Sequence, residues 1–408
     1  MNIRRADPRL MTILVIVFVQ IAGAALILPV LPLYAQDRFA MSPPAITLLV
    51  ASFFAAQFLA GPWLGRLSDR HGRLPVLVFS QIGTAISFVV LALATGPGWL
   101  FAGRILDGIT GGNIIVAQAY VTDITPPDRR TQSLGLIFAA FGLGFSVGPV
   151  LGGVIAAAAG SDALFFTAAG AAALTVVLTW LTLDESLTPD QRAVHRDARQ
   201  AGLRLADVGA NARLVRVLAI AFVGQFALGT LQSTFALFGA AVLFRGASAS
   251  TTQLGIGLLL TVIGVTQLLT QAFVLRRAVA RFGDGRLVVI GGALRAVSLM
   301  VFALVSSPWA AAVGAALFAL GTGISMPPLQ SIATRVVADA FRGGALGWYQ
   351  SALSLSTIFS TAFGGVLFAV HPRTPYWVGA ALAAAAVVPA LSLSRALARE
   401  PAAATAGR

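Results

Sequence analysis

Residues 65–77 read GRLSDRHGRLPVL, a polar stretch between two long apolar segments of the chain. Its first nine positions hold three arginines, an aspartate, a serine and a histidine, although the chain is 57% hydrophobic and only 11% charged. Water-soluble domains have about 45–50% apolar residues. The stretch is therefore predicted to be a loop between two membrane spans, and it indicates how the rest of the chain is organised.

Apolar runs of about 20 residues, each long enough to cross a bilayer core of about 30 Å, recur along the whole sequence. They predict an all-α membrane protein with twelve transmembrane helices, at residues 10–34, 43–65, 74–95, 98–122, 132–157, 162–183, 214–244, 253–275, 287–305, 308–332, 343–369 and 375–394. The first run is too long for the apolar region of a cleaved signal peptide. The chain has no cysteine, which excludes disulfides and thiolate metal sites.

The net charge of +13 invites comparison with nucleic-acid-binding proteins, but the placement of the charges favours membrane topology instead. Every basic residue is an arginine, and the arginines gather in alternate loops; the other set of loops holds only Arg38, Arg245 and Arg373. Basic loops stay on the cytoplasmic side. We expect cytoplasmic termini, a lipid bilayer environment and no nucleic-acid partner. The arginine-only, alanine-rich composition indicates a GC-rich bacterial genome and hence the plasma (inner) membrane.

A polar segment divides the chain into a six-helix bundle at 1–183, a cytoplasmic linker at 184–213 and a second six-helix bundle, with a short cytoplasmic tail, at 214–408. Motifs recur between the halves at one constant offset: Leu134-Gly135 matches Leu346-Gly347, and Gly152-Gly153-Val154 matches Gly364-Gly365-Val366. A six-span duplication is typical of transporters whose halves rock around a site at the bilayer midplane.

Four motifs appear in order along the first half: LILPVLP at 26–32, GRLSDRHGR at 65–73, GRILDGITGG at 103–112 and GLGFSVGPVLGG at 142–153. With these motifs the chain resembles the major facilitator superfamily, and within it the twelve-span drug–proton antiporters, especially the tetracycline-efflux group. The resemblance implies two pseudo-symmetric bundles and a monomer that exports small amphipathic compounds by alternating access. It implies exchange for protons, with no cofactor besides the proton gradient, and no enzymatic activity.

The loop motif also has a physical interpretation. Gly65 and Gly72 are expected to allow close helix approach and a tight turn. Asp69 can accept hydrogen bonds from the free N–H groups at a neighbouring helix N-terminus, where the helix dipole favours an anion.

Arg70 and Arg73 can pair with acids of the next cytoplasmic loop, and Asp123 and Asp128 are the candidates. A network made in only one of two conformations would act as a cytoplasmic gate. The alternative is that these arginines only fix the topology.

Span five carries Gly144, Gly148, Gly152 and Gly153, a smooth strip suited to close helix packing. Pro149 removes one backbone donor and tends to bend the helix. Ordinary packing would account for the glycines. The resemblance to antiporters implies instead a seal between the halves that prevents leak.

Span four holds the strongest chemical signal, because Arg104, Asp107, Gly111 and Gln118 would lie on one side of a continuous helix. Charges inside a membrane are costly and face the protein interior or a wet cavity. Burial and Arg104 act on the protonation of Asp107 in opposite senses. We predict that Asp107, with Arg104, couples transport to protons; the alternative is a static pair that holds the fold.

The sequence departs from the tetracycline-efflux group in span one, where Gln20 stands at the place of a characteristic acid. Glutamine can hydrogen-bond a substrate but cannot carry a proton, so Asp107 is the candidate replacement. Polar residues inside the spans are predicted to line the substrate cavity: Gln20, Gln118, Gln225, Gln232, Arg295 and Gln350.

Three other functions remain open from the sequence. One is a metabolite or sugar transporter of the same fold, either an exporter or a proton symporter. Another is a ligand sensor without turnover. An intramembrane enzyme is disfavoured, because the spans contain no HExxH, no GxSxG and no cluster with metal-ligand spacing.

Overall fold

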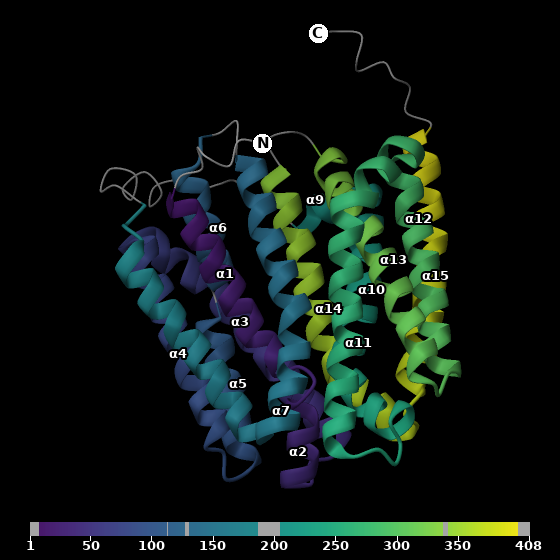
Figure 1. Cartoon of the computed structure of the whole chain (residues 1–408). Helices are drawn as coiled ribbons and strands as arrows, with labels where there is room; N and C mark the ends of the chain where they lie inside the picture. The colour runs from purple at the N-terminus through teal and green to yellow at the C-terminus, as the bar shows by residue number, and fades with distance from the viewer. Residues whose placement is uncertain (1–7, 112, 127–129, 187–204, 338–341, 399–408) are drawn as a thin grey trace. The chain divides into compact units, whose positions relative to one another are not determined.

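The computed structural model describes residues 8–111, 113–126, 130–186, 205–337 and 342–398, apart from a few side chains within the helices. In this part of the chain the regular secondary structure is entirely helical, which confirms the all-α fold (Figure 1). The chain divides into two compact units: Met1–Arg199 with Phe244–Gly264 form unit 1, and Gln200–Leu243 with Val265–Arg408 form unit 2.

The described residues of unit 1 form seven helices and most of an eighth: α1 (Pro8–Leu26), α2 (Leu31–Phe39), α3 (Pro43–His71), α4 (Arg73–Ala92), α5 (Pro97–Thr110), α6 (Asn113–Ile124), α7 (Arg130–Thr182) and the part of α11 (Ala249–Leu269) that ends at Gly264. Proline stands in the first turn of α3 and α5, where its missing N–H leaves no bond unmade.

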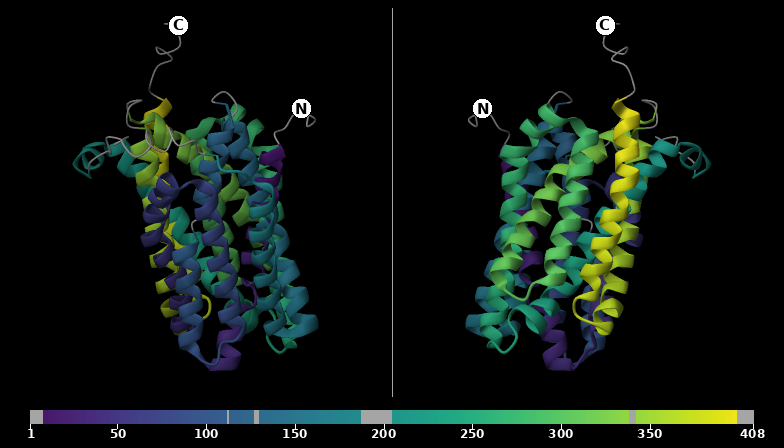
Figure 2. Two further views of the ribbon diagram at one scale, coloured as in Figure 1. Left: turned by 90° about the vertical axis from the view of Figure 1, so that its left-hand side faces the viewer. Right: turned by 90° about the vertical axis from the view of Figure 1, so that its right-hand side faces the viewer.

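The helices of unit 2 are α9 (Leu205–Ala210), α10 (Ala212–Phe238), α12 (Leu275–Leu304), α13 (Pro308–Arg335), α14 (Arg342–Val370) and α15 (Thr374–Ala398). Two short π-helical segments, η2 (Gly239–Leu243) and η3 (Thr270–Val274), follow α10 and α11. α12 packs against both α13 and α15 (Figures 1 and 2).

Nine helical stretches in the described residues are long and apolar enough to cross a membrane. Two of them, Ala139–Thr182 and Ala249–Leu304, have 44 and 56 residues, enough for two crossings each at about 20 residues per crossing. Each contains a glycine with positive φ, Gly160 in the first and Gly283 in the second, where the chain leaves helical geometry. The fourth predicted span is interrupted between α5 and α6, so the twelve predicted spans are all accounted for.

The division into units differs from the predicted boundaries at 183 and 214. Residues Phe244–Gly264 belong to unit 1, because α11 packs closely against α7 of that unit. A Cβ atom on Gly257 would come within 2.5 Å of the Pro149 carbonyl oxygen, and one on Gly264 within 2.6 Å of the Ser146 Cα atom. Most of the predicted linker, residues 187–204, lies outside the described residues.

Each unit has its own core. In unit 1, α1 and α7 run side by side (Figure 1), and buried apolar residues from both helices meet Tyr120 of α6. In unit 2 an aromatic cluster joins α10, α12 and α15, with the Phe238 and Tyr376 rings 4.6 Å apart and the Phe235 and Phe302 rings 5.6 Å apart. Edge-to-face and tilted arrangements of this kind are the preferred geometries for aromatic pairs.

Candidate functional site

A buried ion pair lies inside the fourth span of unit 1. The Arg104 Nη1 atom donates to the Asp107 Oδ2 atom at 2.8 Å, and the two side chains are only 9% and 7% exposed. They stand three residues apart on α5, a spacing that places them on the same helix face. The predicted pair is thus present, while its role in proton coupling stays a prediction.

Neighbouring helices enclose this pair. The Arg104 guanidinium lies over the Phe53 ring of α3, with its Cζ atom 4.1 Å from the ring centroid, and the Thr84 side chain of α4 lies near Asp107. Gly108 lets α3 approach, because a Cβ atom there would collide with the Phe53 carbonyl oxygen. The Arg104 Nε atom is buried without a hydrogen-bond partner among the described residues, so the guanidinium keeps one unused donor beside the carboxylate.

The fourth span breaks one turn after Asp107. α5 ends at Thr110 and α6 begins at Asn113, and the Gln57 Nε2 atom of α3 donates to the Gly111 carbonyl oxygen at 2.9 Å. The prediction that Gln118 shares one continuous helix face with Arg104 is therefore wrong, because the backbone leaves α-helical geometry at Gly111, where φ is −71° and ψ is 20°. Backbone groups freed inside a membrane need a protein partner, and Gln57 supplies one.

A second polar cluster lies where α3 and α4 meet α6 and the end of α7. The Arg73 Nε atom donates to the Asp123 Oδ2 atom at 3.0 Å, so this predicted pair is present. Arg73 also donates from Nη1 to the Ser68 Oγ atom at 2.7 Å, and its side chain is only 6% exposed. Gly72 makes the predicted turn with φ = 106°, a value that favours glycine over other residues.

The anion at the N-terminus of α4 is Glu185, a residue that the sequence analysis did not select. Its carboxylate accepts from the backbone N–H groups of Arg73 and Leu74, at 2.9 and 3.2 Å. Next to it, the Ser186 Oγ atom donates to the Asp123 Oδ2 atom at 3.1 Å. The available signal was an acidic pair directly after the sixth span, which the sequence analysis interpreted only as the start of a solvated linker.

Gly65 does not provide the expected close approach, since a Cβ atom there would meet nothing within 4 Å. Its carbonyl oxygen instead accepts from the Ser68 Oγ atom at 2.8 Å, a local contact that any residue could make. Arg70 is exposed at the end of α3. The side chain of Asp69 and all of Asp128 lie outside the described part of the structure.

Removing the Glu185 carboxylate should destabilise the protein measurably. We expect Glu185→Ala to lower the free energy of unfolding by about 0.5–2 kcal/mol, as for other N-terminal helix caps, since it leaves two donors of α4 unsatisfied. Thermal unfolding in detergent measures the effect. Asp184→Ala is the matched control, because the Asp184 side chain is 78% exposed in its pair with Arg9 and such pairs contribute about 0–1 kcal/mol. Equal losses in the two variants would contradict the capping assignment.

The glycines of α7 pack against two different helices, α1 and α11. Cβ atoms on Gly144, Gly148 and Gly152 would collide with α1, against the Ala22 backbone N, the Ala25 Cβ atom and the Leu26 carbonyl oxygen respectively. Gly153 and Pro149 instead face α11: a Cβ atom on Gly153 would come within 2.8 Å of the Gln253 carbonyl oxygen.

The predicted close packing of this strip is therefore present within unit 1. The seal that the resemblance implied stays a prediction.

Gln225, one of the residues predicted for the substrate cavity, makes a helix–helix contact in unit 2. The Gln225 Nε2 atom of α10 donates to the Thr357 Oγ1 atom of α14 at 2.8 Å. One turn further along α10, Gly229 leaves room for the Ser360 side chain of α14. These side chains hold α10 against α14.

The remaining residues predicted for the substrate cavity lie on separate helices. Gln20 on α1, Gln118 on α6 and Gln232 on α10 are partly buried, and Gln350 on α14 is exposed. Arg295 on α12 is buried, with 3% of its surface exposed. Contact of these residues with a substrate stays a prediction.

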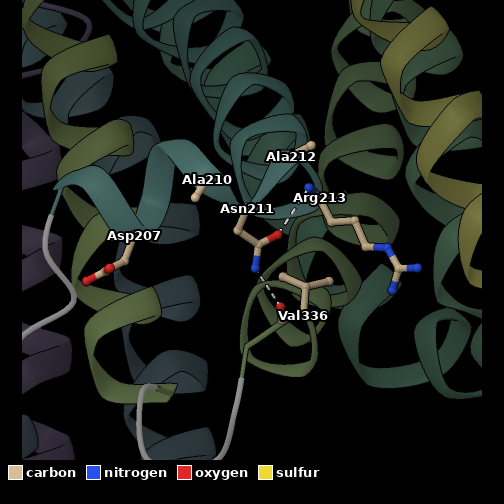
Figure 3. Close-up of a pocket in the computed structure, with 6 residues that line it drawn as sticks. All are labelled: Asp207, Ala210, Asn211, Ala212, Arg213 and Val336. Atoms are coloured by element: carbon tan, nitrogen blue, oxygen red, sulfur yellow. Dashed lines mark hydrogen bonds between the residues drawn. The ribbon is translucent and has the colours of Figure 1, made fainter.

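A surface hollow in unit 2 is lined by Asp207, Ala210, Asn211, Ala212, Arg213 and Val336 (Figure 3). Asn211 caps α10 there: its Oδ1 atom accepts from the backbone N–H groups of Arg213 and Leu214, and its Nδ2 atom donates to the Val336 carbonyl oxygen at 2.8 Å. We therefore assign the hollow to helix capping. In the described part of the chain no group of three or more histidine and acidic side chains could hold a metal ion.

The fold and these buried polar clusters define a polytopic α-helical membrane protein. The chain belongs to the Major Facilitator Superfamily, whose family model matches residues 13–251 and 221–407. That one model matches both halves agrees with the internal repeat seen in the sequence.

Curated relatives cover most of the chain. The tetracycline resistance protein, class C, of Escherichia coli is 32% identical over 93% of this chain and 95% of its own length. Multidrug resistance protein 2 of Bacillus subtilis is 26% identical over 88% of each chain. Among solved structures, a peptide transporter in complex with alafosfalin superposes with a TM-score of 0.77 at 15% identity, covering 96% of this chain and 94% of its own.

Proposed function

We propose that this protein is a proton-coupled efflux antiporter that exports small amphipathic compounds, including antibiotics, by alternating access. The names of its relatives, which are tetracycline and multidrug resistance proteins, support export of drugs. We place it in the plasma (inner) membrane of a bacterium, with both termini in the cytoplasm and the monomer as the working unit. The arginine-rich loops support this orientation.

The Arg104–Asp107 pair is the observation that carries the proposal. A carboxylate in a region from which water is largely excluded exchanges protons according to how far it is exposed and how closely its cation lies. Protonation of Asp107 would release the Arg104 guanidinium, and deprotonation would restore the pair. This gives two charge states of one buried site, which is what coupling to a proton gradient requires.

The position of the pair next to a helix break supports the same function. Discontinuous helices near the bilayer midplane are the places where transporters bind substrates and coupling ions. α5 ends one turn beyond Asp107, and the Gly111 carbonyl oxygen is held by a single side-chain donor. A change in the Gln57 contact would alter the backbone at the site without unfolding either half of the span.

The cluster around Arg73 is proposed as part of a cytoplasmic gate, together with Asp69, Arg70, Gly72 and Asp123. The contacts of Arg73 with Asp123 and of Glu185 with α4 are charge-assisted hydrogen bonds with little exposure to solvent, and such bonds are stronger than exposed pairs. They would stabilise one of the two alternating conformations over the other.

Expression of the wild-type chain in a bacterial host that lacks its own efflux pumps tests the function. We expect the minimum inhibitory concentration of at least one amphipathic antibiotic, tetracycline among those assayed, to rise severalfold over the empty vector. An uncoupler that collapses the proton gradient should restore drug accumulation. No shift for any compound in a broad panel would overturn the drug-efflux proposal.

A further inference from the structure

Arg295 is a buried cation whose charge nothing in the described part of unit 2 neutralises. Only 3% of its surface is exposed, and its Nε and Nη1 atoms are both buried without a hydrogen-bond partner among the described residues. Buried charges in proteins are normally paired and hydrogen-bonded, because an isolated one is very costly. An arginine retained in this state is a candidate for a charge supplied from outside the chain.

The sequence offers no acid that could serve instead within the spans of unit 2. Between Ala212 and Ala398 the acidic residues are Asp284 and Asp339. Asp284 pairs with Arg335, and Asp339 belongs to the loop between spans ten and eleven, outside the described residues. The buried ion pair of unit 1 has no counterpart here.

The Arg295 side chain of α12 packs between α10 and α13 of unit 2. Gly224 of α10 leaves the space that the Arg295 Nη1 atom occupies, since a Cβ atom at that position would collide with it. Gly321 of α13 packs against the stem of Arg295, where a Cβ atom would lie 3.1 Å from its Cγ atom. The two glycines fix the side chain from opposite ends, so its donors are held in place before any ligand binds.

Tyr349 of α14 supplies a second donor. Among the described residues its hydroxyl reaches the Met326 Sδ atom, at 3.7 Å, a weak acceptor. The Met326 Cε atom and the Arg295 Nη1 atom both lie next to Gly224, which brings Tyr349 into the neighbourhood of the guanidinium. A hydroxyl so placed can turn to a stronger acceptor when one is present. Arginine and tyrosine donors beside a methionine suit a ligand with an anionic head group and an apolar body.

We propose that Arg295, with Tyr349, binds the anionic group of the transported compound, so that the substrates are amphipathic organic anions or zwitterions. That the bound compound is a transported substrate rests on the proposed transport function. Binding of the anion to Arg295 requires neither turnover nor a proton gradient. Arg295 would neutralise the negative charge of the ligand in unit 2, while Asp107 exchanges protons in unit 1.

Two fluorescent probes with one ring system and different charge test the proposal: anilinonaphthalene sulfonate and its uncharged parent, phenylnaphthylamine. Binding is measured to the full chain in lipid nanodiscs, with empty nanodiscs subtracted. The wild type should bind the sulfonate more tightly than the neutral parent. Arg295→Met should weaken sulfonate binding by about 10- to 100-fold, as expected for loss of a hydrogen-bonded charge, and leave the neutral probe unchanged.

Two further variants separate charge recognition from a structural role. Gly224→Ala keeps the arginine but displaces its guanidinium, and it should also weaken sulfonate binding selectively. Arg277→Met removes an exposed arginine of the same unit, which donates to the Phe273 carbonyl oxygen, and should change neither probe. The melting temperature of Arg295→Met should equal or exceed that of the wild type, because an unpartnered buried charge has been removed.

A wild type without preference for the sulfonate would overturn the proposal. An equal loss of both probes in Arg295→Met, with a lower melting temperature, would also overturn it and assign Arg295 to the fold. Because these measurements need no gradient, a protein that shows the charge preference but exports no drug would contradict the efflux proposal alone.

Discussion

Replacing Asp107 by asparagine should abolish proton-driven drug transport, down to the level of vesicles that lack the protein. Asparagine has nearly the same shape as aspartate and can still accept a hydrogen bond from Arg104, but it cannot bind and release a proton. Drug movement driven by a pH gradient in proteoliposomes measures the coupled activity. Exchange of labelled for unlabelled drug at equal pH, which needs no proton movement, should persist.

A folding defect has to be separated from a loss of coupling, because Asp107→Asn leaves Arg104 buried without a counter-charge. Breaking a buried pair from one side costs about 3–5 kcal/mol. The double variant Arg104→Gln, Asp107→Asn removes both charges and should recover much of the stability while remaining uncoupled. Asp162→Asn is the matched control, since its carboxylate pairs with Arg38 and is 54% exposed; it should transport normally. Gradient-driven transport by Asp107→Asn at the wild-type rate would contradict the assignment.

A side chain at position 152 should separate α1 from α7. A Cβ atom on Gly152 would collide with the Leu26 carbonyl oxygen, and a backbone atom cannot move aside as the tip of a flexible side chain can. We expect Gly152→Ala to lower the free energy of unfolding by about 1–3 kcal/mol, the usual range for overpacking, and Gly152→Leu to lower it further. Thermal or denaturant unfolding in detergent measures both.

The same helix offers a control for this substitution. Gly170 lies on the exposed side of α7, and a Cβ atom there would meet nothing within 4 Å. Gly170→Ala should stabilise the protein by roughly 0.5–1 kcal/mol, because alanine loses less backbone freedom than glycine in a helix. If Gly152→Ala and Gly170→Ala had the same stability, the close contact of α7 with α1 would not be the reason that position 152 requires glycine.

Local contacts of the candidate site could be predicted from the sequence, whereas contacts across the fold could not. Arg104 and Asp107 are three residues apart, so any helix through them places the two side chains together. Gly72 was predictable for a similar reason, because a tight turn between two spans needs a residue that tolerates positive φ. By contrast, Gly65 lies in the same motif and has no close neighbour, because its environment depends on where the other helices pass.

Glu185 shows why an acid that caps α4 could not be predicted from the sequence. Residues 73 and 185 are far apart in the chain, and they meet because the sixth span returns to the side of unit 1 where α4 begins. Asp69 is near α4 in the sequence, and its predicted contact with a helix N-terminus stays a prediction because its side chain lies outside the described part of the structure. The assignment of Phe244–Gly264 to unit 1 has a similar origin, since it depends on glycines of α11 that match the surface of α7.

By itself the sequence determined the all-α class, the twelve spans and the Arg104–Asp107 pair. These follow from apolar run length, charge placement and spacing along a helix, all of which act over short distances in the chain. Only the tertiary structure decided which glycines meet a neighbouring helix, which acid caps α4, and that Arg295 has no partner for two of its nitrogens. Those outcomes depend on which helices, distant in the sequence, become neighbours in the fold. Whether a buried charge finds a partner depends on the side chains that these neighbouring helices place around it.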